Sequence, residues 1–472
     1  MAAQITFPTS SAPGVNPHEG SGRLVNVYAE KSPPAARFPV TWRRTPGVAL
    51  ETTVSFVTNC RMIFDTTSPG SGDLEASAFL VFNNEVYSAE RSADGIWVTN
   101  DIGAISGSRP LTMARNNKTP PPDVVAVAPE GGAYSLNTPG MAYPDTDLPA
   151  GNVNSVSVLD GYFLFTQRNG IIWASQLNST NVATDSNVAT QGRPDGLLRG
   201  VAYRKEFFAF GEHSIEVWRD IGTSPFPLEF VTMIPRGICG THAVAGWEEG
   251  WSNELIWAAD DNRVYKLDGY TPVPVSQDAV SRAIATCANK LLLDAIVYMS
   301  GQHAMWQLTS PGEWTWCYNQ TTGEWHELQS TGRLDRRIRA SCHLGGEWIV
   351  GDVTTGNIGR ISPTTYQEFG ATLPWLIESA PVHEFPGRIM APRLDFDFSK
   401  NSTASTVDIT WSNDGGHTYV ANPLTRSLTK DIVFITNTGI ATSKGKRFRL
   451  AGSSNAPMAF MGAGAATVTR AA

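Results

Sequence analysis

A short apolar hairpin recurs along this chain and constrains the fold more than any other feature of the sequence. Each copy has an apolar arm, a polar turn and a second arm in which apolar and polar residues alternate, which is the period of a β-strand. The copies are SAFLVFNNEVYSA, DVVAVAPEGGAYSL, GYFLFTQRNGIIWAS, KEFFAFGEHSIEVW, ELIWAADDNRVYKL and AIVYMSGQHAMWQL. One aromatic residue marks the second arm of each copy, namely Tyr87, Tyr134, Trp173, Trp218, Tyr265 and Trp306.

The successive spacings of these aromatic residues are 47, 39, 45, 47 and 41 residues. A period in the forties, made of short strands separated by turns, is typical of β-propeller blades. A seventh copy at residues 345–360 keeps the apolar arm but has Ile358 where the aromatic residue is expected. The sequence therefore predicts an all-β protein with a propeller of about six to seven blades. We expect Trp173 and Trp218 to wedge between adjacent blades.

The composition agrees with a β-rich chain that has many turns. Its 472 residues are too many for one small core, so two domains or one large repeat-built domain with an appendage are expected. Charged residues make up only 17%, and there are 43 glycines, 30 prolines and 14 tryptophans. One helix is predicted over residues 278–295, where Val280, Ile284 and Leu291–Leu293 are apolar. We expect it to pack on the flank of the propeller.

The rhythm of the repeat divides the chain into three segments. Residues 1–50 are rich in proline and lack a helical pattern, which predicts an extended N-terminal arm. Residues 51–375 carry the repeat and form the predicted propeller. Residues 376–472 contain further short alternating strands, which predicts a C-terminal antiparallel β-domain. The tail that ends this segment, residues 456–472, is rich in small residues and is expected to order only against a partner.

The turn in the fourth copy of the repeat carries Glu212 and His213, with Glu216 on the strand that follows. Acids and a histidine are the residue types of catalytic and metal sites. The corresponding turns of the other copies vary freely, however, so a catalytic cluster would be an exception among equivalent turns. We interpret Glu212 and His213 as an ordinary polar turn and expect Glu216 to be the more sensitive of the three. No catalytic, cofactor-binding or metal-ligating residue is predicted.

The remaining candidate groups do not form a recognisable constellation. The eight histidines lack i, i+4 or HExxH spacing, so metal binding has no support in the sequence. The stretch SNDGGHTY at 412–419 resembles the Asp-box turn of sialidase propellers, in which the carboxylate bonds local backbone N–H groups. Asp395 and Asp397 lie two residues apart on a predicted strand and therefore share one face, whereas glycoside hydrolysis needs carboxylates that face each other across the substrate. A propeller-type glycan-processing enzyme, sialidase-like or lyase-like, remains the alternative function.

The net charge of −8 argues against a nucleic-acid-binding face spread over the whole protein. The two basic clusters are DRRIR at 335–339 and KGKRFR at 444–449. We interpret the first as a solvated loop and the second as a strand with Arg447 and Arg449 on one face. Contact with a phosphate backbone or with an acidic protein is the alternative for each cluster.

Three further features bear on where the protein is made. The five cysteines are scattered singly without a CxxC motif, which favours reduced and mostly buried thiols. The N-terminus lacks the basic start and apolar core of a signal peptide. No apolar run approaches the ~20 residues that span a bilayer. We therefore expect production in the cytoplasm without membrane insertion.

Two parts of the sequence resemble a known family. The first is LVNVYAEKSPPAARFPVTWRRTPG at 24–47, with its N-x-Y-x-E and P-G elements. The second is QGRPDGLLRGVAYRKEFFAFGEHSIEVWRDIG at 191–222, followed by RGICGTHA at 236–243. The order of these elements is similar to that in the packaged-DNA stabilisation proteins of short-tailed bacteriophages. These are tail-accessory hub proteins of the Salmonella-phage type.

The resemblance implies a structural, non-enzymatic protein of the virion tail that needs no cofactor. It implies a homo-oligomeric ring, generally a hexamer, beneath the portal and its adaptor protein. Such a ring is expected to close the channel, to retain the packaged DNA and to provide docking sites for a tail needle or plug and for a tailspike or tail fibre. Assembly in the host bacterial cytoplasm follows from the same resemblance, and contact with packaged double-stranded DNA is a candidate interaction.

Overall fold

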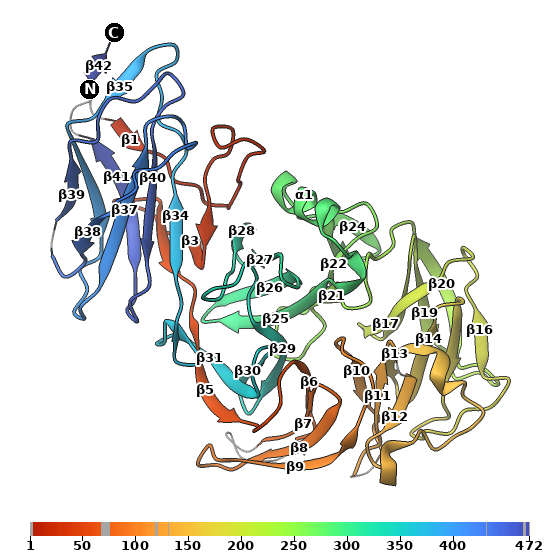
Figure 1. The fold of residues 1–472 in the computed structure, drawn as a ribbon. Coiled ribbons are helices and arrows are strands. Elements are labelled where there is room, and N and C mark those ends of the chain that lie inside the picture. Colours follow the sequence, from red (N-terminus) through yellow and green to blue (C-terminus); the bar gives the residue numbers. More distant parts are fainter. Residues whose placement is uncertain are drawn as a thin grey trace.

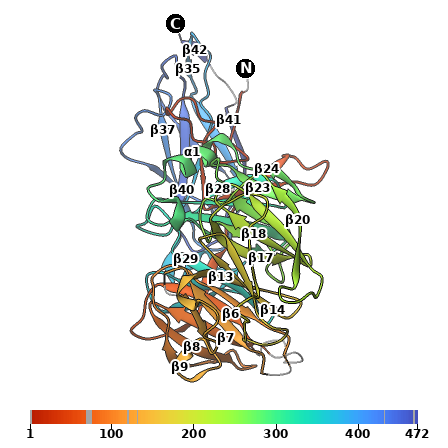
Figure 2. The ribbon, with the colours of Figure 1, turned by 90° about the vertical axis from the view of Figure 1, so that its right-hand side faces the viewer.

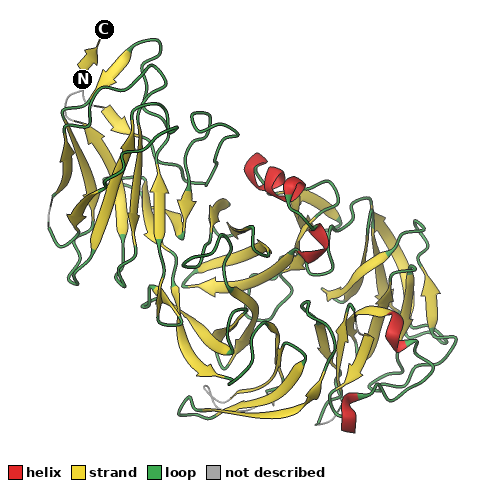
Figure 3. Cartoon of the chain, in the orientation of Figure 1, coloured by secondary structure: helices red, strands yellow, loops and turns green. Residues whose placement is uncertain are grey.

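The computed structural model describes residues 3–67, 76–118, 121–130, 132–430, 432–465 and 469–471. Within these residues the chain forms a ring of seven blades, each built on antiparallel strands, and a two-layered β-sandwich (Figure 1). Figure 2 shows that the sandwich extends away from the ring and that both termini lie at its far end. The predicted all-β class is confirmed, since strands dominate the fold (Figure 3).

Five blades of the ring are formed by consecutive stretches of chain in which each strand pairs antiparallel with the next. The first blade contains β6 (Cys60–Asp65), β7 (Ala76–Phe82), β8 (Glu85–Arg91) and β9 (Trp97–Ala104). The second contains β10 (Thr112–Arg115), β11 (Val124–Ala128) and β12 (Gly132–Ser135). The third contains β13 (Val153–Leu159), β14 (Tyr162–Gln167), β15 (Ile171–Ala174) and β16 (Asn187–Ala189). The fourth contains β17 (Leu197–Tyr203), β18 (Glu206–Gly211), β19 (Ile215–Asp220) and β20 (Leu228–Ile234). The fifth contains β21 (Val244–Ala245), β22 (Ile256–Ala258), β23 (Val264–Asp268) and β24 (Thr271–Pro274).

The repeated hairpin of the sequence corresponds to the second and third strands of a blade. Trp218 of β19 is 1% exposed and packs with Leu164 and Ile172 of the preceding blade. Trp173 of β15 is partly buried against a cluster that includes Val125 of the second blade. Both tryptophans therefore lie between adjacent blades, as predicted. The wedge follows from geometry, because one face of each sheet is buried only by the neighbouring blade.

The sixth copy of the repeat has a different register from the others. Trp306 lies on β26, the second strand of its blade, whereas the marker aromatic residues of the first five copies lie on third strands. The copy AIVYMSGQHAMWQL covers β25 and β26, the first hairpin of the sixth blade. The prediction that Trp306 is equivalent to Trp218 is therefore wrong. Every hairpin of a blade has the same apolar–turn–apolar pattern, so the pattern alone does not distinguish the first hairpin from the second.

The sixth blade continues into the sandwich through an N-terminal strand. It contains β25 (Asp294–Ser300), β26 (His303–Ser310), β27 (Trp314–Asn319) and β28 (Glu324–Glu327), and its neighbours beyond the blade are β2 (Leu24–Val25) and β34 (Trp375–Glu378). Val25 pairs in parallel with Glu327, and Leu24 pairs antiparallel with Ile377. A single nine-stranded sheet thus joins the ring to the sandwich.

The seventh blade joins the two ends of the propeller. It contains β29 (Ile338–Leu344), β30 (Glu347–Asp352), β31 (Asn357–Ser362) and, as its outer strand, β5 (Gly47–Thr53), with β32 (Gln367–Glu368) and β33 (Ala371–Thr372) beyond it. Ile361 of β31 pairs with Val48 of β5. Because a strand from the start of the chain completes the last blade, backbone hydrogen bonds hold the ring closed.

The sandwich buries an aromatic core between two sheets. One sheet contains β3 (Val27–Lys31), β4 (Val40–Arg44), β41 (Ala459–Ala465), β36 (Arg393–Phe398) and β39 (Val433–Thr436), with β1 (Ala3–Ile5) also paired to β41. The other contains β34, β40 (Arg447–Gly452), β37 (Thr406–Ser412) and β38 (Leu424–Ser427). A small two-stranded sheet is formed by β35 (Arg388–Met390) and β42 (Thr469–Ala471). The alternation of RLDFDF is confirmed, since Leu394, Phe396 and Phe398 enter the core.

Two expectations about the chain ends need correction. The predicted N-terminal arm has paired strands, because β3 pairs with β4 and β4 pairs with the C-terminal strand β41. The expectation that the tail orders only against a partner is wrong for Ala459–Ala465, which form β41 within the same chain. Phe460 accounts for this order, since its ring packs against those of Phe7 and Trp42. Residues 466–468 and 472 of the predicted tail lie outside the described residues.

The described residues contain one α-helix, α1 (Asp278–Thr286), which is shorter than predicted. Its Val280 and Ile284 are buried against the propeller, as expected for a helix on the flank (Figure 3). The helix ends because Cys287 has extended backbone angles and Asn289 caps a separate 3-10 turn, Lys290–Leu292. Two further 3-10 turns, Pro139–Met141 and Ala150–Asn152, connect the second and third blades. Of the helices described, none is long and apolar enough to cross a membrane.

Candidate functional site

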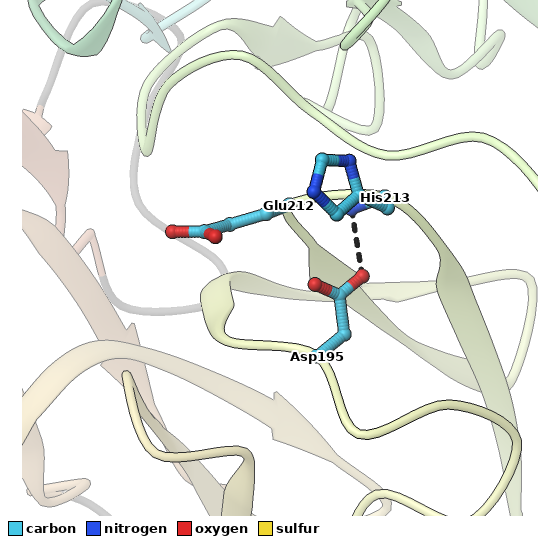
Figure 4. Close-up of side chains that lie close together, drawn as sticks. All are labelled: Asp195, Glu212 and His213. Carbon is cyan, nitrogen blue, oxygen red and sulfur yellow. Dashed lines mark hydrogen bonds between the residues drawn. The ribbon is translucent and has the colours of Figure 1, made fainter.

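The turn between β18 and β19 is fixed by an acid from the connection between the third and fourth blades (Figure 4). Oδ2 of Asp195 accepts hydrogen bonds from the backbone N–H of His213 at 2.7 Å and from Oγ of Ser214 at 3.1 Å. Glu212 and His213 are exposed, and Nδ1 of His213 lies 3.7 Å from Oδ2 of Asp260. Ligand atoms of Asp195, Glu212 and His213 lie within 4.8 Å of one another. Asp195 therefore links the turn between β18 and β19 to the connection between the third and fourth blades, which is a structural role.

Glu216 differs from its two neighbours in the sequence because it is buried, with 1% of its surface exposed. Its Oε1 accepts a hydrogen bond from the backbone N–H of Gly192 at 2.6 Å, so the side chain holds the connection between blades. Its Oε2 has no hydrogen-bond partner among the described residues. Burial raises the pKa of this carboxyl, while the backbone N–H groups of residues 191–193 oppose that rise.

The Asp-box turn is structural, as the sequence indicates. The carboxylate of Asp414 accepts hydrogen bonds from the backbone N–H of Thr418 at 2.9 Å, from its Oγ1 at 2.6 Å and from Oγ of Ser412 at 2.6 Å. These hydrogen bonds favour the ionised form and hold the pKa of Asp414 well below its usual range. The carboxylate is therefore occupied by its own turn.

The paired carboxylates of β36 lie on the outer face of the sandwich. Asp395 forms an ion pair with Arg393 at 2.7 Å, and Asp397 lies 3.4 Å from Arg37. The prediction that the two acids share one face is confirmed by the burial pattern of the strand. This pair does not face across a substrate groove, so it does not have the arrangement that glycoside hydrolysis requires.

The basic cluster at 335–339 is an internal ion-pair network, so its interpretation as a solvated loop is wrong. Arg336 is 1% exposed, lies 3.4 Å from Glu368 and donates to the hydroxyl of Tyr298 at 2.7 Å. Arg337 pairs with Asp352. Arg339 pairs with Asp335 at 3.1 Å. The arginines join the sixth and seventh blades, because buried guanidinium groups need carboxylate or carbonyl partners.

Most basic side chains of the cluster at 444–449 have partners within the sandwich. Arg447 and Arg449 share one face of β40, as predicted, and both pair with Glu378, at 3.1 and 2.8 Å. The guanidinium of Arg449 stacks over the ring of Tyr419 at 3.6 Å. Lys446 is 1% exposed and donates to backbone and hydroxyl oxygens of Thr438 at 2.8 and 2.9 Å. Lys446 and Arg447 are therefore buried within the sandwich, whereas Lys444 is exposed and Arg449 is partly exposed.

Charged residues that the sequence analysis did not single out meet at the axis of the propeller. A cavity of about 380 Å³ is lined by residues from the first strand of every blade. A second cavity of about 260 Å³, here called the axial mouth, shares Arg61, Pro110, His242 and Asp294 with it. The residues come from different blades, far apart in the sequence. No local motif could have indicated that they meet.

The guanidinium of Arg61, at the axis, is held by several backbone carbonyl groups. Its guanidinium donates to the carbonyl oxygens of Arg109 at 2.7 Å, Asn83 at 2.7 Å and Ile105 at 2.9 Å. Asp294 lines the same two cavities, and burial raises the pKa of its carboxyl to about 6 against the opposing effect of Arg339 and Arg199. Burial and the positive charge of Arg199 hold the pKa of His242 well below its usual value.

These observations define a closed β-propeller joined to a β-sandwich, in which the predicted basic clusters serve internal architecture. A family model described as "Bacteriophage P22 Gp10, beta-propeller" matches residues 57–366. The chain belongs to this family of phage packaged-DNA stabilisation proteins. It is accordingly a structural phage protein, and both the suggested family and the predicted propeller are confirmed.

Two solved structures are similar to this chain at low sequence identity. One is the WD40 β-propeller domain of Doa1, with 11% identity, a TM-score of 0.42 and coverage of 66% of this chain and 96% of that chain. The other is the computationally designed Ika8 protein, with 11% identity, a TM-score of 0.37 and coverage of 66% and 99%. No curated protein matches the sequence.

Proposed function

We propose that this protein assembles as a homo-oligomeric ring, a hexamer, in the tail of the phage particle. The ring sits beneath the portal and its adaptor protein and closes the channel to retain packaged DNA. It provides docking sites for a tail needle or plug and for a tailspike or tail fibre. The observation that carries the proposal is the family match over residues 57–366.

The way in which the propeller and the sandwich are joined suits a protein that transmits force within a phage particle. The nine-stranded sheet connects propeller and sandwich by backbone hydrogen bonds, so force on one part passes to the other without a flexible linker. The net charge of −8 suits the wall of a conduit, because an acidic wall repels departing DNA. The internal pairing of Arg336, Arg447 and Arg449 favours architecture over tight DNA binding.

The division of labour within the chain is part of the same proposal. Residues 51–375, completed by β5 (Gly47–Thr53), form the propeller that carries the family match over residues 57–366. Residues 376–472, with most of the N-terminal arm 1–50, present the sandwich to neighbouring proteins. No catalytic, cofactor or metal role is assigned to any residue. Release of reducing sugar from host surface polysaccharide by the purified protein would instead favour the glycan-processing alternative.

Ring assembly is tested by sedimentation of the purified protein alone and with portal–adaptor complexes of the same phage, followed by cryo-electron microscopy of tails. We expect ring formation on the complex and a hexamer beneath the adaptor. Particles that lack the protein are expected to package DNA and then lose it. A protein that stays monomeric with the complex and is absent from purified tails would refute the proposal.

A further inference from the structure

The axial mouth and the larger cavity that adjoins it bring together side-chain nitrogens that lack hydrogen-bond partners. Arg199 and Arg339 are 9% and 6% exposed. Nε and Nη1 of Arg199, Nη1 of Arg339 and Nε2 of His242 are shielded from solvent and have no hydrogen-bond partner among the described residues. Arg199 lines the larger axial cavity, Arg339 lines the mouth, and His242 lines both.

These groups belong to one electrostatic site. Asp294 lines both cavities, and its carboxyl interacts with the charges of both Arg199 and Arg339. His242 in turn lies within the field of Arg199 and Arg61. The site is therefore assembled from the first, fourth, fifth, sixth and seventh blades, around Asp294.

Unpaired buried donors on charged groups are costly, because the desolvation of each group is not repaid by a hydrogen bond. Two other buried arginines are well satisfied, as the three carbonyl contacts of Arg61 and the contacts of Arg336 with Glu368 and Tyr298 demonstrate. Arg44 and Arg91 also have unpaired nitrogens, but each binds carbonyl or carboxylate oxygens through another nitrogen. The unpaired nitrogens of Arg199, Arg339 and His242 are therefore expected to bind an acceptor that is not among the described residues.

The charge balance identifies the kind of acceptor. Arg61, Arg109, Arg333 and Arg339 line the mouth, and Asp294 is the carboxylate beside them. Asp335 is already shared by Arg333 and Arg339, at 2.8 and 3.1 Å, and Glu130 lies 3.5 Å from Arg109. The four arginines of the mouth thus exceed the three nearby acids by one positive charge. Glu248 lines the larger cavity and interacts with the charge of Arg199 there. An anion with several acceptor oxygens matches this excess.

We propose that the axial mouth binds a small oxyanion, such as sulfate or inorganic phosphate, through Arg339 and His242 in its wall and through Arg199 from the adjoining larger cavity. A cavity of about 260 Å³ accommodates a single small oxyanion with some of its water, whereas a DNA duplex does not fit within it. Leu291, Leu293 and Pro311 in the wall limit the access of water and so strengthen the interaction. The oxyanion links five blades across the axis and stabilises the ring. This inference does not depend on the proposed tail function.

Sulfate is the suitable probe, because its charge stays constant between pH 5 and 8. Isothermal titration and equilibrium dialysis of the full chain with sulfate, against chloride at matched ionic strength, measure the binding directly. We expect saturable binding of one sulfate per chain. Arg199→Met is expected to weaken it at least tenfold, and the surface variant Arg263→Met serves as the matched control with unchanged affinity.

A variant that binds more tightly is a useful second test, because misfolding can explain a loss of binding but not a gain. Asp294→Asn removes the carboxylate that competes for the same donors, and we expect sulfate to bind about tenfold more tightly than to the wild type. Circular dichroism verifies that each variant is folded. The proposal is overturned if folded wild-type protein shows no saturable binding beyond that of chloride, or if Arg199→Met and Asp294→Asn both retain wild-type affinity.

Discussion

Asn26 and Gln329 hold each other by two hydrogen bonds at the junction of propeller and sandwich. Nδ2 of Asn26 donates to the carbonyl oxygen of Gln329 at 2.7 Å, and the backbone N–H of Gln329 donates to Oδ1 of Asn26 at 3.1 Å. Nδ2 also donates to the carbonyl oxygen of Pro374 at 2.7 Å. Asn26 has a left-handed backbone with φ of 52°, which asparagine tolerates better than most residues. The asparagine of the N-x-Y-x-E element thus fastens three segments together.

Replacement of Asn26 by Ala is expected to lower the free energy of unfolding by about 3–5 kcal/mol, because buried backbone groups lose their partners. Thermal and urea denaturation measure the change. Asn437→Ala is the matched control, since Asn437 also has a left-handed backbone, with φ of 60°, but is exposed. Equal losses in the two variants would show that backbone strain, and not the junction, explains the effect.

Trp218→Ala is expected to cost about 3–5 kcal/mol, because the ring is fully buried between the third and fourth blades. Trp173→Ala is expected to cost less, since Trp173 is only partly buried. Melting temperatures and urea midpoints of both variants test the order. A melting temperature within a degree or two of wild type for Trp218→Ala would contradict the wedge role.

The three residues around the fourth hairpin are expected to respond unequally. Glu216→Ala removes the acceptor for the Gly192 N–H and is expected to cost roughly 1–3 kcal/mol and to impair incorporation into particles. Glu216→Gln keeps an acceptor and should stay close to wild type. Glu212→Ala and His213→Ala are expected to change stability by no more than about 0.5 kcal/mol. Loss of infectivity from His213→Ala, in particles that assemble and hold DNA normally, would reveal a functional site at the turn.

Lys446 predicts a pH dependence of stability. Burial lowers its pKa to about 8 in the folded protein, below the value of about 10.4 in an unfolded chain. The folded state therefore pays a cost for the charged lysine below pH 8, and this cost disappears as the pH rises from about 8 to about 10.4. By the size of the shift the cost is on the order of 3 kcal/mol.

Lys446→Met removes the titrating group and is the comparison that isolates its effect. The stability of the wild type relative to this variant is expected to increase between pH 7.5 and 10, whereas Lys444→Met, at an exposed neighbour, should follow the wild type. Urea denaturation across this pH range measures the difference. A wild-type-to-variant difference that is independent of pH would contradict the assigned pKa.

Much of the propeller could be predicted because its strands are local patterns. The hairpins are encoded within about fifteen residues each, with a polar turn between two apolar arms. Six of the seven copies coincide with the second and third strands of a blade. The predicted equivalence of Trp306 and Trp218 was wrong, because the first and second hairpins of a blade have the same sequence pattern. The helix was predicted too long because apolar Leu291–Leu293 continue beyond Thr286, although Cys287 has already left the helical conformation.

The sequence by itself determined the all-β class, the repeat and the inward alternation of β36, because these depend on neighbours along one strand. Only the tertiary structure decided which charged side chains form ion pairs and which have hydrogen-bond donors without a partner. Arg336, Arg447 and Arg449 look like exposed basic residues in the sequence, yet their partners, Glu368 and Glu378, lie on other strands of the fold. The groups of the axial mouth meet because the ring closes, and closure requires β5 from the start of the chain to pair with β31 near its end. Such pairings are long-range, and their free energy depends on burial and distance in space, which local sequence does not specify.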